Sequence, residues 1–291
     1  NDLPPQPWIN VIANPRFGFL LSESGGGYTW AENSREFKIT PWSNDPVLDP
    51  PGEICYLRDE ADGLLWSATP LPILDDEPYT IRHGQGYSII SHKYREIEHE
   101  AYYWTPPDDP VKIIELTLKN SGAESRKLAV TYYLEWTLGV DREKTQPHIV
   151  TEVDSNNEAL LARNTYQDNF HDYYGFLDLW TNHPVIERSW TGNRHGFIGR
   201  NGSLARPAGL AAVSLDNRTG AGFNPCGAIQ LKVDLKPNEE AVIYILVGAA
   251  PNRIAAQQYL QRYRKRNVTL QSRNAVTGFW QDFLGQVEVT T

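Results

Sequence analysis

The sequence contains no methionine and only two cysteines, Cys55 and Cys226, among its 291 residues. Two cysteines cannot supply the disulfide framework of a small secreted domain, so we expect two buried thiols and a reducing compartment. A chain without an initiator methionine is expected to be a processed piece or an excised fragment of a longer protein. Its length still allows one large β domain or two ordinary domains with a sizeable core.

Long apolar runs and a surplus of basic residues are also missing. No run approaches the roughly 18 residues that a membrane-spanning helix needs, and Asn1–Trp8 is too polar and proline-rich for a signal peptide. The formal net charge of −9 disfavours nucleic acid as a partner, because nucleic-acid binding needs a positive face. A neutral ligand such as a sugar is compatible with this charge, and we expect the chain to be cytoplasmic.

Alternating apolar residues indicate that most of the chain is β-structure. In Leu128–Leu138 they recur at every second position, which places them on one face of a strand. The apolar run Val111–Leu118 precedes it across a turn-rich stretch, and 229–235 and 241–247 repeat this arrangement across a second turn. Both pairs are predicted to be hairpins. With many other short runs between turn residues, the fold class is predicted to be mainly β, a large antiparallel β-sandwich over residues 1–250.

The pattern changes to a helical period after Gly248. Asn252 is a suitable N-cap for a helix that starts at Arg253. A second helical stretch ends at Gly285 and carries an apolar stripe formed by Ala275, Val276, Phe279, Trp280, Phe283 and Leu284. We therefore expect two amphipathic helices over 253–285, in a tail of residues 251–291, and a wide apolar face that packs against another surface.

Aromatic side chains are abundant, with nine tryptophans in the chain. A tryptophan face stacks on the C–H face of a pyranose, while neighbouring polar side chains bond its hydroxyls. A single tryptophan is more often core filler, but one cluster predicts a sugar-facing loop: Trp30, Asn33, Arg35, Trp42, Asn44 and Asp45. The preceding Ser24–Trp30 lacks a phosphate-loop signature and is predicted to be a tight hairpin or a loop that lets a ligand approach the backbone.

Signatures of catalysis and metal binding are weak. A glycosidase needs two carboxylates that face each other across a bond, whereas the pairs Asp75–Asp76 and Asp108–Asp109 lie beside prolines, where we expect solvated loops. The histidines show no metal-ligand spacing, so we predict no metal site. His83 and His148 occupy polar, turn-like settings, where each is either a ligand contact or an ordinary surface histidine.

Four stretches are long enough to compare with a known family: Ala13–Val47, His83–Ser88, His148–Asp154 and Phe197–Leu210. Together they resemble the N-terminal β-sandwich of inverting phosphorylases of glycoside hydrolase family 94, and within it the phosphorylase-like region of cyclic β-1,2-glucan synthases. The resemblance implies a mutarotase-like super-sandwich and a helical linker that leads to an (α/α)6 barrel, which this chain lacks. The general acid would be an aspartate of that barrel, with inorganic phosphate as co-substrate. The resemblance therefore assigns no catalytic residue and no cofactor to this chain.

The resemblance also implies sugar contacts from the sandwich. In cellobiose-type members a Gln-Arg pair reaches the acceptor sugar. By position this pair falls on Gln146 and Pro147, or on His148 with a one-residue shift, so the glutamine is kept and the arginine is not. The Arg35 segment is similar to a loop that borders the active site, in some members that of the partner subunit.

We therefore predict a non-catalytic, sugar-binding and structural N-terminal domain of a β-1,2-glucan-processing phosphorylase or glucan synthase. Its partners would be a β-linked glucan or gluco-oligosaccharide, the barrel of the same polypeptide, and a second copy in a homodimer. Other regions of the parent protein could anchor it in the inner membrane.

Two alternatives share the predicted fold, and fold alone does not decide function. An independent mutarotase-like epimerase needs a histidine and a carboxylate that face each other in the concave sheet. A freestanding carbohydrate-binding module would not carry an apolar helix without a packing partner.

Overall fold

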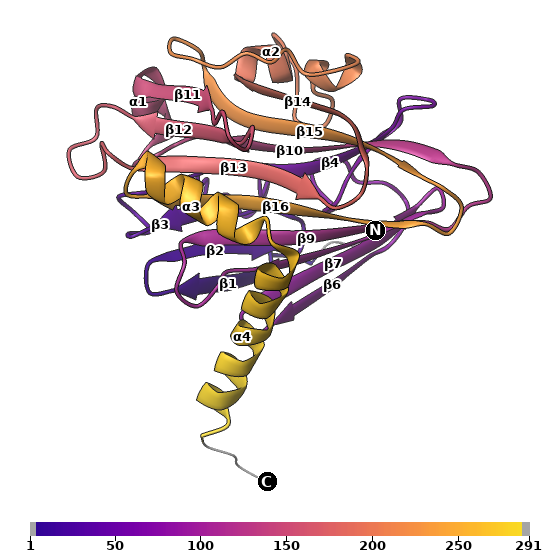
Figure 1. Cartoon of the computed structure of the whole chain (residues 1–291), viewed down its shortest axis with the longest axis horizontal. Helices are drawn as coiled ribbons and strands as arrows, with labels where there is room; N and C mark the ends of the chain where they lie inside the picture. Colours follow the sequence, from indigo (N-terminus) through magenta and orange to yellow (C-terminus); the bar gives the residue numbers. More distant parts are fainter. Residues whose placement is uncertain (1–3, 287–291) are drawn as a thin grey trace.

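The structure is a computed structural model in which residues 4–286 are described. Within this range the strands form three antiparallel sheets (Figure 1). Their inward side chains share one core. The largest sheet has the order β11 (Ile149–Val153), β12 (Leu160–Asn164), β13 (Tyr174–Thr181), β16 (Glu240–Ala250), β9 (Val111–Asn120), β8 (Ile97–Trp104), β7 (Tyr87–Tyr94) and β6 (Tyr79–Gly84). The second has the order β14 (Val185–Asn193), β15 (Pro225–Leu235), β10 (Arg126–Glu135), β4 (Glu53–Asp59) and β5 (Leu65–Ser67). The third consists of β1 (Ile9–Asn14), β2 (Phe17–Ser22) and β3 (Thr29–Ala31).

The short helices lie in the connections, and the two long helices follow the last strand. Their bounds are α1 (Arg142–Thr145), η1 (Gln146–His148), α2 (Arg194–Ile198), η2 (Ala208–Ala211), α3 (Arg253–Tyr263) and α4 (Arg266–Leu284). The predicted class, a large antiparallel β-sandwich followed by two helices, is therefore confirmed. Among residues 4–286, no helix combines the length and the apolar composition needed to cross a bilayer.

The two predicted hairpins are wrong. β9 pairs with β8 and β16, whereas β10 pairs with β4 and β15, so the turn between β9 and β10 crosses from one sheet to the other. The turn between β15 and β16 crosses between the same two sheets. Alternation shows which face of a strand is buried. It cannot distinguish a hairpin from an arch over a shared core, because both bury every second residue.

Each main sheet is also covered on its outer face. Phe197, Leu210 and Leu215 form an apolar cluster with Tyr56 of β4 and Tyr133 of β10. On the larger sheet, apolar side chains of α3 and α4 pack on β8, β9, β13 and β16; they are Ala256, Leu260, Tyr263 and Val276. This double burial explains why β16 contains so few polar residues.

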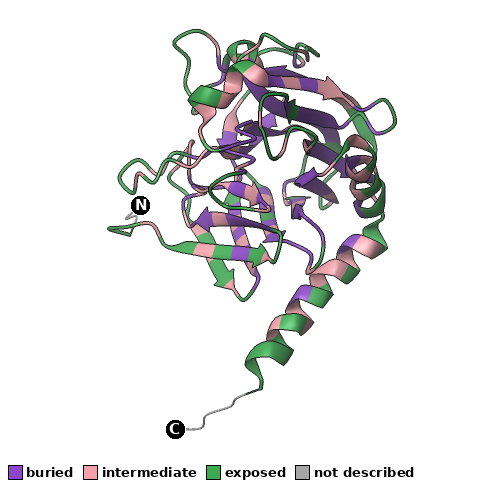
Figure 2. Cartoon of the chain, turned by 90° about the vertical axis from the view of Figure 1, so that its left-hand side faces the viewer, coloured by how far each residue is buried: buried purple, intermediate pink, exposed green. Residues whose placement is uncertain are grey.

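The two C-terminal helices begin and end close to the predicted positions. The Asn252 side chain caps α3 by accepting a hydrogen bond from the Ala255 amide at 2.9 Å. α4 starts against the sheet and then projects away from the body (Figure 2), so Phe279 and Phe283 are 53% and 56% exposed. Residues 287–291 of the predicted tail lie outside the described residues.

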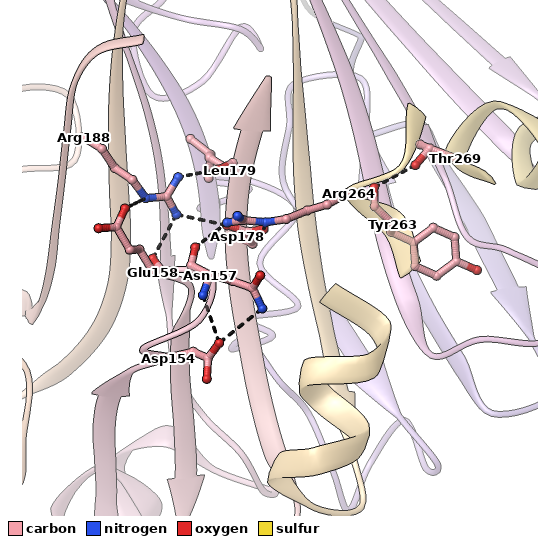
Figure 3. Close-up of polar contacts among 9 residues, drawn as sticks. All are labelled: Asp154, Asn157, Glu158, Asp178, Leu179, Arg188, Tyr263, Arg264 and Thr269. Carbon is pink, nitrogen blue, oxygen red and sulfur yellow. Dashed lines mark hydrogen bonds and ion pairs between the residues drawn. The ribbon is translucent and has the colours of Figure 1, made fainter. Parts of the chain in front are cut away.

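A buried charge network holds the junction between α3 and α4 on the sheet (Figure 3). Asp178 of β13 is fully buried and accepts hydrogen bonds from Arg264 at 2.7 Å and from Arg188 of β14 at 3.0 Å. Thr269, near the start of α4, donates to the Tyr263 carbonyl at 2.8 Å. Two guanidinium groups thus bind one buried carboxylate, and the helices leave the sandwich from a defined position.

Candidate functional site

Three aromatic rings lie in a row where the third sheet meets the following loop. Tyr28 lies between Trp30 and Trp42, with ring-centroid distances of 5.2 and 5.1 Å. Both indoles are half-buried. Trp30 lies directly on Gly18 of β2, where an added Cβ would come within 2.4 Å of the indole. Each tryptophan therefore keeps part of its surface accessible, and sugar stacking requires an accessible ring face.

The predicted polar residues of this loop differ in what they can offer a ligand. The side-chain oxygens of Asn33 and Asp45 accept backbone N–H groups at 2.9 to 3.1 Å and shape local turns. The Arg35 side chain is 82% exposed and contacts Glu36 at 3.5 Å. Asn44 is exposed, with a left-handed φ of 45°. Arg35 and Asn44 are thus the most available of the four.

A shallow cavity of about 180 Å³ is lined in part by Trp42. Its lining combines apolar rings with polar loop side chains: Gln6, Pro7, Ile9, Trp42, Ser43, Asn44, Asp45, Pro46, Asp49 and Pro50. Such a mixture of apolar faces and hydrogen-bonding groups suits a carbohydrate.

Gln146 and His148 lie together in η1, directly after α1. The Gln146 side-chain oxygen accepts a hydrogen bond from Arg142 at 3.2 Å. The His148 ring stacks on Tyr166 with centroids 4.4 Å apart. An arginine therefore stands beside Gln146 even though the next residue in the sequence is a proline. Arg142 is itself held by Glu135 at 2.9 Å.

Lys38 and Gln167 join the aromatic loop to this second group. Lys38 pairs its backbone with Gly139 and donates from its ammonium to the Val140 carbonyl at 2.8 Å. Gln167 donates to the Glu36 carbonyl at 3.0 Å. The loop of residues 28–45 and the segment of residues 139–148 therefore form one edge of the molecule, which we call the loop edge.

His83 lies in a different neighbourhood from the other predicted site residues. It is on β6, and its Nδ1 is 2.9 Å from the Ser88 hydroxyl. Burial lowers its pKa below the ordinary value. Among residues 4–286, no hydrogen bond, ion pair or ring contact links His83 to the loop edge. The predicted site residues therefore lie in two separate regions, with His83 in one and the others at the loop edge.

The family comparison agrees with this architecture. The family model described as "Glycosyl hydrolase 94, supersandwich domain" matches residues 1–266. The chain belongs to the glycoside hydrolase family 94 supersandwich family.

Two relatives of this supersandwich carry names that describe carbohydrate enzymes. It is 34% identical over 291 residues to cyclic beta-(1,2)-glucan synthase NdvB of Rhizobium meliloti, which covers 99% of the chain but 10% of that protein. It is 26% identical over 250 residues to N,N'-diacetylchitobiose phosphorylase of Vibrio furnissii, covering 84% of the chain and 31% of the relative. The chain thus spans a minor part of the length of both proteins.

Solved structures share the fold at low sequence identity. A bacterial glucoamylase complexed with acarbose superimposes with a TM-score of 0.55 and 11% identity, over 99% of this chain and 40% of the glucoamylase. A putative aldose 1-epimerase from Escherichia coli K12 gives a TM-score of 0.50 and 7% identity, over 84% of this chain and 99% of the epimerase. The second match confirms the mutarotase-like sandwich.

The acidic pairs Asp75–Asp76 and Asp108–Asp109 were expected to lie in solvated loops, and this expectation is wrong for Asp109. Asp109 is 7% exposed; it accepts a hydrogen bond from Tyr263 at 2.6 Å and pairs with Arg262 at 2.9 Å. The Asp75 carboxylate lies within hydrogen-bond distance of His92, with 3.0 Å between Asp75 Oδ2 and His92 Nε2. Adjacent prolines indicate a loop, but they do not show whether a helix or strand later covers it.

Several supersandwich residues of the site were not predicted. Tyr28 lies within the segment Ser24–Trp30, and only the fold places it between two tryptophans. Arg142 and Tyr166 have no local signal. Lys112 does have a local sequence signal, because a lysine within an apolar strand is expected to be buried and to need a charged partner. That partner is Glu53, whose carboxylate lies 2.8 Å from the Lys112 ammonium. No group of three His, Cys, Asp or Glu side chains among residues 4–286 is arranged to hold a metal.

Proposed function

We propose that this supersandwich is the sugar-facing, structure-completing N-terminal domain of an enzyme that processes β-linked glucans by phosphorolysis, and that it has no turnover alone. The half-buried aromatic row Tyr28, Trp30 and Trp42 carries the proposal. It belongs to the same loop as Arg35, and Lys38 of that loop joins it to the segment that carries Gln146 and His148. The names of the phosphorylase and glucan synthase relatives support the substrate class.

The catalytic partner in this proposal is an (α/α)6 barrel of the same polypeptide. That barrel would supply the general acid and the site for inorganic phosphate. The loop edge would supply contacts to the sugar on one side only. A half-site should bind weakly, with a dissociation constant of about 1 mM, or roughly −4 kcal/mol.

The buried state of two sheet histidines supports a non-catalytic role over an independent epimerase. The His92 side chain has no exposed surface and is held between Asp75 and the Pro78 carbonyl. His99 is 3% exposed and its Nε2 donates to the Ala68 carbonyl. Both imidazoles are thus buried and already hydrogen-bonded within the protein, whereas proton transfer needs hydrogen-bond reach to the substrate.

Binding is tested by titrating the chain with β-1,2-linked gluco-oligosaccharides while recording tryptophan fluorescence. Trp30→Ala or Trp42→Ala should weaken binding about tenfold, because one stacking face contributes ~1.4 kcal/mol. Trp190→Ala is the matched control, since Trp190 is half-buried like Trp30 and Trp42 but lies on β14, outside the loop edge. Equal losses in all three variants would contradict the assignment.

Catalytic silence is tested separately. The chain is incubated with β-1,2-glucan and inorganic phosphate, and glucose 1-phosphate is assayed against a spiked standard. We expect no release above background. Sustained release that scales with protein concentration would show that the domain is an enzyme by itself.

A further inference from the structure

A largely buried carboxylate lies beneath the aromatic row. Glu53 of β4 projects between the sheets, and its side chain is 7% exposed. One oxygen accepts hydrogen bonds from Lys112 of β9 at 2.8 Å and from Tyr132 of β10 at 2.6 Å. The other accepts from the hydroxyls of Thr40, at 2.9 Å, and Thr29. Four donors from four separate segments therefore converge on one side chain.

The two threonine donors occupy the ends of the sugar-facing loop. Thr29 directly precedes Trp30, and Thr40 lies two residues before Trp42. The Thr29 amide also donates to the Thr40 hydroxyl at 2.8 Å. Both stems of the loop are thus tied to each other and to Glu53. The remaining donors, Lys112 and Tyr132, belong to the two main sheets.

The electrostatics favour an ionised Glu53. Burial alone would raise the pKa of this carboxyl, but the Lys112 ammonium and the hydrogen bonds from Lys112, Thr29 and Tyr132 outweigh burial and lower the pKa. An ionised carboxylate accepts all four hydrogen bonds, and charge-assisted bonds are stronger and more directional than neutral ones.

We propose that Glu53 is a positioning residue that fixes the spacing and orientation of Trp30 and Trp42 for a β-linked gluco-oligosaccharide. This inference rests on the proposed function of the loop edge. Stacking surfaces need supporting contacts that hold their ring geometry, because a loosely held ring must be ordered at the cost of affinity. Through Thr29 and Thr40, the rigid sandwich core supplies that support.

The test separates the loop side of Glu53 from its core side. Thr40→Val and Thr29→Val each remove a loop-side hydroxyl with little change of shape. Tyr132→Phe removes a core-side hydroxyl from the same carboxylate and is the matched control. Thr40→Ser keeps the hydroxyl and is the rescue variant. Thermal melting of every variant reports the purely structural effect.

The first readout needs no sugar. Indole N–H signals of Trp30 and Trp42 are assigned by ¹⁵N NMR with the help of Trp→Phe variants. Either valine variant should broaden or split these two signals, while Tyr132→Phe and Thr40→Ser leave them unchanged. Unchanged signals in both valine variants, or equal broadening in Tyr132→Phe, would overturn the inference.

The second readout is the affinity for a β-1,2-linked gluco-oligosaccharide. We expect the valine variants to bind about fivefold to tenfold more weakly, and Tyr132→Phe to change less than about twofold. Equal affinities across the set overturn the positioning role while the proposed function stands. If the unmodified chain binds the sugar without moving the Trp30 and Trp42 signals, the proposed function fails, and the first readout still decides the role of Glu53.

Discussion

At the scale of single residues, the core contains an unusual buried imidazole. His99 of β8 lies between the sheets, where its Nε2 donates to the Ala68 carbonyl at 3.1 Å. Its Nδ1 has no hydrogen-bond partner among the described residues. Burial, together with the neighbouring His92, lowers the pKa of His99 to about 3. A protonated imidazole is therefore disfavoured in the folded protein.

This depressed pKa predicts acid sensitivity of the fold. Between the ordinary value of 6.5 and about 3, the unfolded chain binds a proton at His99 and the folded chain does not. Stability is therefore lost as the pH falls through this window, by at most about 1.4 kcal/mol per pH unit. His99→Gln should flatten the dependence of the unfolding free energy on pH, measured by urea unfolding from pH 7 to pH 4.

The control for that experiment is His171→Gln, because the His171 side chain is 58% exposed. This substitution should leave the slope unchanged. An unchanged slope in His99→Gln would show that other groups cause the acid sensitivity.

Residue types in the sequence predicted part of the loop edge and not the rest. Trp30 and Trp42 could be selected because they flank a polar segment within a short distance in the chain. Arg142 and Tyr166 reach Gln146 and His148 through the fold, and their local sequence gives no reason to choose them. Two of the selected polar residues, Asn33 and Asp45, use their side-chain oxygens within turns, which residue type alone does not reveal.

At the scale of secondary-structure elements, the contact between α4 and the β6–β7 turn holds the second half of α4 against the sandwich. Trp280 lies against Gly86, where an added Cβ would approach the indole nitrogen to 2.3 Å. Gly86 has a φ of 76°, and Gly63 in the β4–β5 turn has a φ of 73° with nothing within 4 Å of an added Cβ. The two glycines therefore share a left-handed backbone conformation, but only Gly86 is in contact with a tryptophan.

This pair allows a matched prediction. Alanine at either position costs about 1 kcal/mol for the left-handed backbone. Gly86→Ala should cost roughly 1–3 kcal/mol more, because it forces Trp280 away from the turn. Urea unfolding gives the free energies, and hydrogen exchange should rise in the second half of α4 in Gly86→Ala alone. Equal losses in the two variants would show that Trp280 contributes nothing to the docking of α4.

Elements were predicted better than their pairings. The N-cap at Asn252 and the apolar spacing of Ala256, Leu260 and Tyr263 are local, so the start and buried face of α3 could be read from the sequence. The partners of β9, β10, β15 and β16 depend on contacts between distant segments. Their short turns looked like hairpin turns although each crosses the core.

At the scale of the whole molecule, α4 extends beyond the sandwich and carries an uncovered aromatic surface. Phe279 and Phe283 stack with centroids 5.9 Å apart, and Leu284 beside them is 44% exposed. Exposed apolar patches of this kind tend to be covered by association. Trp280, by contrast, already packs on the body.

These two faces predict separate outcomes. Phe279→Ser/Phe283→Ser should shift sedimentation of the chain toward monomer with little change in the melting temperature. Trp280→Ser should lower stability by about 2 kcal/mol, as expected for a partly buried aromatic residue. Ile254→Ser is the control, since Ile254 is 68% exposed on α3. Identical sedimentation of the double variant and the unmodified chain would mean that the surface is simply solvated.

The central claim, that the loop edge meets the sugar, is tested most directly by mapping binding across the whole chain. Backbone and indole ¹⁵N signals are followed while a β-1,2-linked gluco-oligosaccharide is added to millimolar concentration. The account predicts fast-exchange shifts in residues 28–45 and 139–148, largest at Trp30, Trp42 and Gln146, with His83 unaffected. Shifts centred on the outer face of the larger sheet, or none at saturating sugar, would contradict it.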